Sequence, residues 1–163
     1  MSAASPGSIS RAARAAARLG AVQALYQMDV AGTALNEVLA QFASRRVGEQ
    51  FDDGQCGHPD AALLEDIVRG VLSAQEEIDT AIDHHASAGW KLPRLDATVR
   101  AILRAGGYEL LKRPDIPPKV TISEYVNVAR AFFEGGDEPG FVNGVLDAVA
   151  RAHRADELHG RHR

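Results

Sequence analysis

Residues 60–82, DAALLEDIVRGVLSAQEEIDTAI, decide the fold class of this 163-residue chain. Leucine, isoleucine and valine recur there at steps of three and four residues, which is the period of an amphipathic helix. Asp60 is a suitable N-cap, and the acidic residues fall mainly on the face opposite the apolar stripe. The pattern predicts one long helix beginning at Asp60, with Gly70 at a position that permits a bend.

The same period continues on both sides of this segment. The chain contains 28 alanines and few alternating β-branched residues, so no strand is predicted. Ser10 and Asp96 are candidate N-caps, and Gly32 is a candidate stop for the first helix. The sequence therefore predicts an all-α fold of six to seven helices. Besides the segment above, the helices are expected over about 11–30, 33–46, 96–113, 121–134 and 137–154.

Two local signals refine this expectation. Residues 121–124, TISE, match a capping box, with Val120 and Tyr125 placed as a hydrophobic staple, so a helix is predicted to begin at Thr121. Gly106 and Gly107 lie inside a predicted helix, where each glycine lowers helix stability relative to alanine. We expect close helix packing to explain the pair, although close approach of a ligand is the alternative.

The domain organisation follows from the turn signals. Residues 1–10 contain no apolar run and are expected to be a flexible tail, not a secretory signal. A loop is expected over 47–59, and the segment 90–94 is expected to link two halves. We predict one domain over 11–154, with an N-terminal half at about 11–90 and a C-terminal half at about 91–154, followed by a frayed tail at 155–163.

Charge is strongly segregated along the chain. The formal net charge of −4 argues against a protein that coats nucleic acid through bulk electrostatics. Residues 1–20 nevertheless carry +3 and residues 91–120 carry +4, whereas residues 61–90 carry −5. This distribution favours one face for an anion and another for a basic partner, with scattered solvated charge as the alternative.

The chain carries no recognisable catalytic or metal-binding motif. It has no GxSxG, GxxxxGK[ST] or HExxH pattern, so no enzymatic activity and no cofactor are predicted. His84 and His85 point about 100° apart on a helix and cannot chelate one metal from one face. The single cysteine, Cys56, and the absence of an 18-residue apolar run indicate a cytoplasmic protein that does not span a membrane.

Four segments in order resemble the bacterial NusB transcription antitermination family. They are RAARAAARLGAVQALY at 11–26, ILRAGGYEL at 102–110, IPPKVTISE at 116–124 and FVNGVLD at 141–147. The resemblance implies two small packed helical bundles and a non-enzymatic role. It further implies binding of boxA RNA together with NusE, a small-subunit ribosomal protein, and entry into the elongating RNA polymerase complex, notably on ribosomal RNA operons. A helical protein-interaction scaffold without RNA binding is the alternative.

The resemblance and the charge pattern together nominate site residues. Arginines of the first helix would contact phosphates, and the second basic block would add contacts. Phe141 would stack on an unpaired base, with a place in the core as the alternative. The predicted RNA-binding residues are Arg11, Arg14, Arg18, Arg104, Lys112, Lys119, Asp137 and Phe141.

A separate set of residues is predicted to meet the basic partner NusE. The acids of the negative segment would steer it electrostatically, and Tyr26 would lie at the edge of the RNA or NusE surface. The predicted partner-binding residues are Tyr26, Glu65, Glu76, Glu77 and Asp83. The sequence leaves open whether surplus apolar helix surface serves NusE or a homodimer.

Overall fold

The structure is a computed structural model that describes residues 10–48, 60–86 and 91–155, with the side chains of 45–48 left undescribed. The expected N-terminal tail, most of the 47–59 loop with Cys56, the start of the linker at Trp90 and most of the C-terminal tail lie outside these residues.

The described residues form seven α-helices, one 3₁₀ turn and no strand, which confirms the predicted all-α fold. The helices are α1 (Arg11–Ala31), α2 (Leu35–Gly48), α3 (Ala61–Ser73), α4 (Gln75–His85), α5 (Ala97–Lys112), α6 (Pro118–Phe132) and α7 (Glu138–His153), with the turn η2 at Leu92–Arg94.

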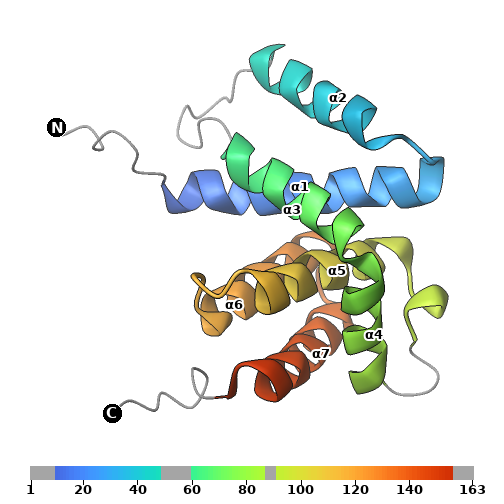
Figure 1. Cartoon of the computed structure of the whole chain (residues 1–163), viewed down its shortest axis with the longest axis vertical. Coiled ribbons are helices and arrows are strands. Elements are labelled where there is room, and N and C mark those ends of the chain that lie inside the picture. The colour runs from blue at the N-terminus through green and yellow to red at the C-terminus, as the bar shows by residue number, and fades with distance from the viewer. Residues whose placement is uncertain (1–9, 49–59, 87–90, 156–163) are drawn as a thin grey trace, which may run out of the picture.

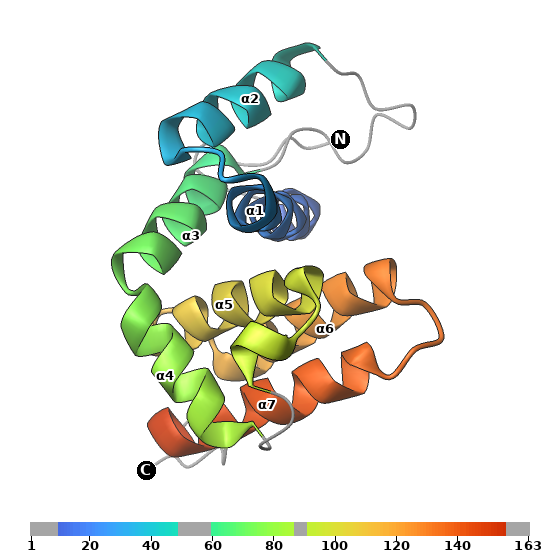
Figure 2. The ribbon, with the colours of Figure 1, turned by 90° about the vertical axis from the view of Figure 1, so that its right-hand side faces the viewer.

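The helices pack as two small bundles that share one core. Figure 2 shows α1, α2 and α3 above α4, α5, α6 and α7, with α5 facing α1. The sequence placed residues 75–85 in the N-terminal half, but α4 packs against α5 and α7. The boundary between the two bundles therefore lies at the α3–α4 junction and not near residue 90.

The predicted helix starts are largely confirmed. Ser10 Oγ accepts the N–H of Ala13 at 2.9 Å, and Asp60 Oδ1 accepts the N–H of Leu63 at 3.1 Å. Asp96 caps α5 in the same way. Gly32 ends α1 in the left-handed conformation with φ of 72°, as expected of a C-terminal glycine.

The long helix predicted from Asp60 is wrong, because it divides into α3 and α4 at Ala74. Ala74 has φ of −119°, outside helical geometry, and the chain changes direction so that α3 packs on α1 while α4 packs on α5 and α7. Gly70, where the sequence permitted a bend, lies inside α3 and is not the point at which the helix breaks. A Cβ at Gly70 would lie 2.2 Å from Cε1 of Tyr108, so this glycine makes room for the tyrosine ring.

The capping box predicted at Thr121 is wrong as well. α6 begins at Pro118. Backbone N–H groups in the first turn of a helix have no helical acceptor, so a proline, which has no N–H, is tolerated there. Thr121 is instead buried inside the helix, and its hydroxyl donates to Glu109 at 3.3 Å. Val120 is 43% exposed and forms no staple.

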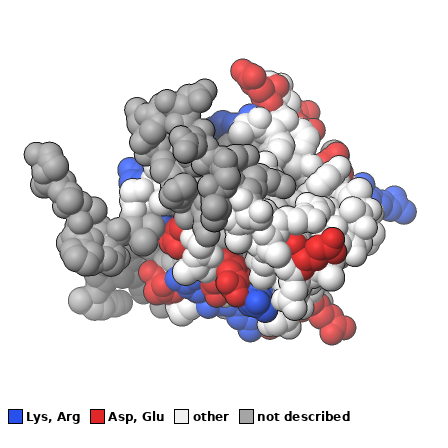
Figure 3. All heavy atoms as spheres, turned by 90° about the horizontal axis from the view of Figure 1, so that it is seen from above, with Lys and Arg blue, Asp and Glu red and all other residues white. Residues whose placement is uncertain are grey.

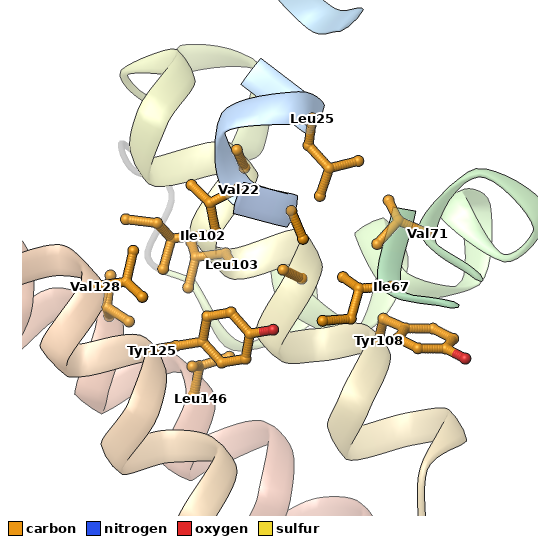
Figure 4. Packing of buried hydrophobic residues seen from close by; sticks show 14 of the residues in the cluster. Val22, Leu25, Ile67, Val71, Ile102, Leu103, Tyr108, Tyr125, Val128 and Leu146 are labelled. Atoms are coloured by element: carbon orange, nitrogen blue, oxygen red, sulfur yellow. The ribbon is translucent and has the colours of Figure 1, made fainter. Parts of the chain in front are cut away.

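Helix packing explains the glycine pair in α5, as expected. A Cβ at Gly106 would lie 2.8 Å from Leu146, and one at Gly107 would lie 3.1 Å from Ile78. The two glycines let α5 approach its neighbours at the centre of the core. Figure 4 shows this region, where side chains from several helices meet around Leu103 and Tyr125.

Candidate nucleic-acid interface

The N-terminal end of α1 presents the first cationic group. Arg11 is exposed and Arg14 is partly exposed, while the first turn of the helix contains no acidic residue. The N–H of Asp60 donates to the carbonyl of Ala13, which fixes the start of α3 beside this turn. Two arginines thus lie at the positive end of the helix dipole, where a bound anion relieves their repulsion.

A groove opens beside Arg14, between α1, the start of α3 and the turn that joins α5 to α6. Its lining includes Arg113 and Asp115 from that turn and Asp66 from α3. Arg113 donates to Asp66 at 2.7 Å and to Asp115 at 2.8 Å. The hydrogen bond from Arg113 lowers the pKa of Asp115 to about 2. The guanidinium of Arg113 is therefore paired with two carboxylates of the groove lining.

Arg18 lines the inner wall of the same groove but is not one of the exposed arginines. Its side chain is only 3% exposed, because α5 and α6 cover α1 at this point. The guanidinium donates to both carboxylate oxygens of Glu109, at 2.9 and 3.0 Å. Burial by itself lowers the pKa of Arg18, but the hydrogen bond and charge of Glu109 outweigh it and raise that pKa.

The carboxylate of Glu109 is the centre of a buried polar cluster. The hydroxyl of Tyr125 donates to it at 2.6 Å, and that of Thr121 donates at 3.3 Å. Burial, followed by the charge and hydrogen bond of Glu109, raises the pKa of Tyr125 well above its ordinary value. No buried side-chain polar atom in the described part of the chain lacks a partner. The cluster joins α1, α5 and α6 through satisfied hydrogen bonds.

Arg104 and Lys112 lie away from the exposed end of α1. Arg104 is 16% exposed and donates twice to Asp79, both at 2.9 Å, near the other end of α1. Lys112 pairs with Glu77 at 2.8 Å. Both cations therefore pair with carboxylates of the chain, Lys112 in an exposed pair, and neither of them lines the groove beside Arg14.

Three further predicted RNA contacts lie on α6 and α7. Lys119 is exposed in the first turn of α6, next to the turn that lines the groove at Arg14. Asp137 is exposed at the start of α7, and Phe141 is half-buried against the core. α6 and α7 are successive antiparallel helices, so Asp137 lies roughly 20 Å from Lys119. Only Lys119 is close to the Arg14 groove.

The predicted partner-binding acids are exposed to different degrees. Glu65 pairs with Arg69 at 2.6 Å, and Glu76 is exposed in the first turn of α4. Asp83 is structural, because its Oδ1 accepts the N–H of Leu92 at 2.8 Å. Tyr26 is 41% exposed, in keeping with a surface position.

Two buried charged residues, Glu109 and Arg154, were not predicted from the sequence. Arg154 is 7% exposed, and its guanidinium donates to the carbonyls of Ile116 at 2.9 Å and Pro114 at 3.1 Å. It thereby fixes the α5–α6 turn that lines the groove. The sequence could have indicated a buried carboxylate at Glu109, because this acid lies between Tyr108 and Leu110 on the apolar side of α5. No sequence pattern indicates the burial of Arg154, because its partners are backbone carbonyls distant in sequence.

Positive and negative side chains are mixed on the visible surface. Figure 3 shows blue and red groups side by side on the face seen from above, without a uniform basic coat.

Within residues 10–48, 60–86 and 91–155, no three metal-binding side chains converge. None of the helices in these ranges combines the length and the hydropathy of a membrane span.

Comparisons with known proteins agree on one family. The NusB family model matches residues 15–151. A protein of Bradyrhizobium sp. strain BTAi1 named transcription antitermination protein NusB is 52% identical over 145 residues, which are 89% of this chain and 85% of that protein. A relative of the same name from Rhodopseudomonas palustris strain BisB18 is 50% identical over 145 residues, which are 89% and 85% of the two chains.

Solved structures show the same fold. The structure of T. maritima NusB has a TM-score of 0.72 and 27% identity, and the match covers 90% of this chain and 96% of that one. We conclude that the chain belongs to the NusB family.

Proposed function

We propose that this chain is a non-enzymatic transcription antitermination factor that binds boxA RNA together with NusE. Membership of the NusB family and about 50% identity to proteins named transcription antitermination protein NusB support this function. A protein of the same fold has been crystallised with NusE and double-stranded RNA. The proposal places the chain in the cytoplasm, within the RNA polymerase antitermination complex, notably on ribosomal RNA operons.

The observation that carries RNA binding is the start of α1. Arg11 and Arg14 lie there with no acid in the first turn, and neither is buried. Lys119 continues this surface across the α5–α6 turn. We assign the first phosphate contacts to these three cations, and a base contact to Phe141 with Asp137 farther along α7.

As a basic partner, NusE would supply cations for RNA phosphates, of which this chain exposes few. The chain has a net charge of −4, Arg18 is buried on Glu109, and Arg104 and Lys112 pair with carboxylates of the chain itself. Few cations are left for RNA, so a basic partner that adds phosphate contacts would raise the affinity sharply.

We assign the docking of NusE to the exposed acids and to an apolar patch. Glu65, Glu76 and Glu77 would steer the basic protein, and the patch consists of exposed Tyr26 and Val30, one turn apart on α1. A homodimer through this patch would compete with NusE. Reversing the charges of Glu65 and Glu76 should slow association with NusE at low salt, and an unchanged association rate would exclude the steering.

An arginine variant tests the RNA contacts. In fluorescence anisotropy with labelled boxA RNA, Arg11→Ala/Arg14→Ala should weaken binding and flatten the dependence of log K on log salt by about 1.4, which is about 0.7 per lost phosphate contact. Arg94→Ala is the matched control, because Arg94 is exposed on η2 outside this surface. Equal affinity and salt slope for all three proteins would contradict the assignment.

One observation favours the second candidate function, a protein-interaction scaffold without RNA binding. Three of the predicted RNA-binding cations are paired with carboxylates of the chain itself. Such a scaffold would bind NusE with its affinity unchanged by boxA RNA, whereas the antitermination factor would bind the two cooperatively.

A further inference from the structure

The turn between α5 and α6 lacks the backbone donors that its own carbonyl groups need. Residues 113–118 read RPDIPP, and a proline has no N–H. A helical donor for the carbonyl of Leu110 would come from position 114, which is Pro114. For the carbonyl of Pro114, a donor three or four residues later would come from Pro117 or Pro118. These carbonyls therefore need a donor from outside the turn.

Arg154, which follows the last residue of α7, supplies that donor. Its guanidinium donates to the carbonyls of Ile116 at 2.9 Å, Pro114 at 3.1 Å, Arg113 at 3.4 Å and Leu110 at 3.5 Å. Arg154 is only 7% exposed, so solvent has little access to these bonds. A lysine would not replace it fully, because its donors sit on one atom, whereas the guanidinium spreads them over three nitrogens.

The turn held by Arg154 is one wall of the groove beside Arg14. Arg113 and Asp115 contribute to that wall, and Lys119 follows in the first turn of α6. The hydrogen bond from Arg113 is the largest cause of the low pKa of Asp115, and the charge of Arg154 lowers that pKa further. The buried cation is thus coupled to an exposed carboxylate of the groove.

Arg154 itself is not part of the groove lining. Any influence of Arg154 on a bound phosphate therefore passes through the position of the turn and of Lys119 behind it. A turn that is ordered before binding saves the ligand the cost of ordering it, which raises the affinity without adding a contact.

We propose that Arg154 is a positioning residue of the RNA surface, which holds the α5–α6 turn in its binding position before RNA arrives. The inference rests on the proposed function for its effect on RNA. Its effect on the turn is measurable without RNA, so the two parts are tested separately.

Amide hydrogen exchange tests the turn in the free chain. Arg154→Met removes the donors and keeps a long side chain, so exchange should accelerate about tenfold or more at Ile116, whose N–H donates to the carbonyl of Arg113 at 3.1 Å. Arg154→Lys should accelerate it less. Val38→Ala is the control for lost stability, because Val38 is fully buried on α2, which packs on α1 and α3. Exchange at Ile116 that is unchanged in Arg154→Met, or equally fast in Val38→Ala, would overturn the proposal.

Fluorescence anisotropy with labelled boxA RNA tests the consequence, at a temperature at which every variant is folded. Arg154→Met should bind about fivefold or more weakly than the unmodified chain, and Arg154→Lys should lie between the two. The dependence of log K on log salt should keep its slope, because no phosphate contact is lost. Affinity for NusE should be unchanged, because the acids assigned to NusE lie on α3 and α4.

The RNA measurements can overturn the proposal in three ways. RNA affinity in Arg154→Met equal to that of Val38→Ala would show that the turn does not need to be held. A flattened salt slope would make Arg154 a phosphate contact, and equal losses of RNA and NusE affinity would show a general defect of the fold. Absence of boxA binding by the unmodified chain, with and without NusE, would instead refute the proposed function, and hydrogen exchange would still decide whether Arg154 holds the turn.

Discussion

Arg18 and Glu109 form a doubly hydrogen-bonded pair that links α1 to α5 inside the protein. Tyr125 and Thr121 donate to the same carboxylate, so its charge is satisfied without water. A buried pair of this kind costs desolvation, and its removal as a whole can be neutral. Loss of only one partner is different, because it leaves an uncompensated charge in the core.

Glu109→Gln should therefore destabilise the protein strongly. We expect a loss of about 3–5 kcal/mol in the free energy of unfolding, measured by denaturant titration, because Arg18 keeps its charge without a counterion. Glu65→Gln, which breaks an exposed pair with Arg69, is the matched control and should change stability by about 0.5 kcal/mol or less.

The double replacement Arg18→Met/Glu109→Met separates charge from packing. It should recover much of the stability lost in Glu109→Gln, because no unpaired charge remains. A double variant as unstable as Glu109→Gln would show that the pair acts through shape and not through charge.

Tyr108 predicts a specific alkaline pH dependence. Burial, followed by the hydrogen bond to Asp66, raises the pKa of Tyr108 to about 12 in the folded chain. Since this pKa is raised above its ordinary value of about 10, the resulting stability is present below pH 10 and is lost as the pH rises toward 12. Denaturant titrations from about pH 9 to 11 should show a shallower fall in stability for Tyr108→Phe than for the unmodified chain. Equal slopes would contradict the assignment.

At the scale of the element, glycines inside helices serve two purposes. Gly70 in α3 leaves space for the ring of Tyr108, with no room for a methyl group. Gly144 in α7 has nothing within 4 Å of the position of a Cβ. The intrinsic cost of glycine is the same at both sites, so the surroundings decide the effect of substitution.

Gly70→Ala and Gly144→Ala form a matched pair. Gly70→Ala should lower the free energy of unfolding by about 1–3 kcal/mol, because the ring of Tyr108 must move. Gly144→Ala should raise it by about 0.5–1 kcal/mol through helix propensity. Thermal or denaturant unfolding measures both changes, and two changes of the same sign would refute this account of α3 packing.

The helices themselves were predictable from apolar period and caps, as Ser10, Asp60 and Asp96 show. Their interruptions were not. The break at Ala74 has no proline or glycine of its own and arises because α3 and α4 pack on different partners. The start of α6 was misplaced, because residues 121–124 satisfy a capping pattern in sequence while Thr121 bonds to Glu109 across the core.

The candidate site was only partly predictable for a related physical reason. Arg11, Arg14 and Arg18 share one stripe of α1, and their spacing cannot show where α5 and α6 cover that stripe. Burial removes Arg18 from the surface, and carboxylates distant in sequence hold Arg104 and Lys112. Segment charge therefore overestimated the number of cations available to RNA.

At the scale of the whole molecule, the two bundles share one core. α1 packs on α5, and the Arg18–Glu109 pair crosses this contact, so neither bundle is closed by itself. We expect one cooperative unfolding transition, with the same midpoint for helix content by far-ultraviolet circular dichroism and for tyrosine environment by near-ultraviolet circular dichroism. Two separated midpoints would show that the bundles unfold independently.

The most direct test of the proposed function is the cooperative binding of RNA and NusE. Fluorescence anisotropy of labelled boxA RNA and of a scrambled RNA should be measured against the chain, with and without NusE, at two salt concentrations. We expect preference for boxA, tighter binding when NusE is present, and a salt dependence that reports the phosphate contacts. Equal and weak binding of both RNAs, unchanged by NusE, would contradict the antitermination function.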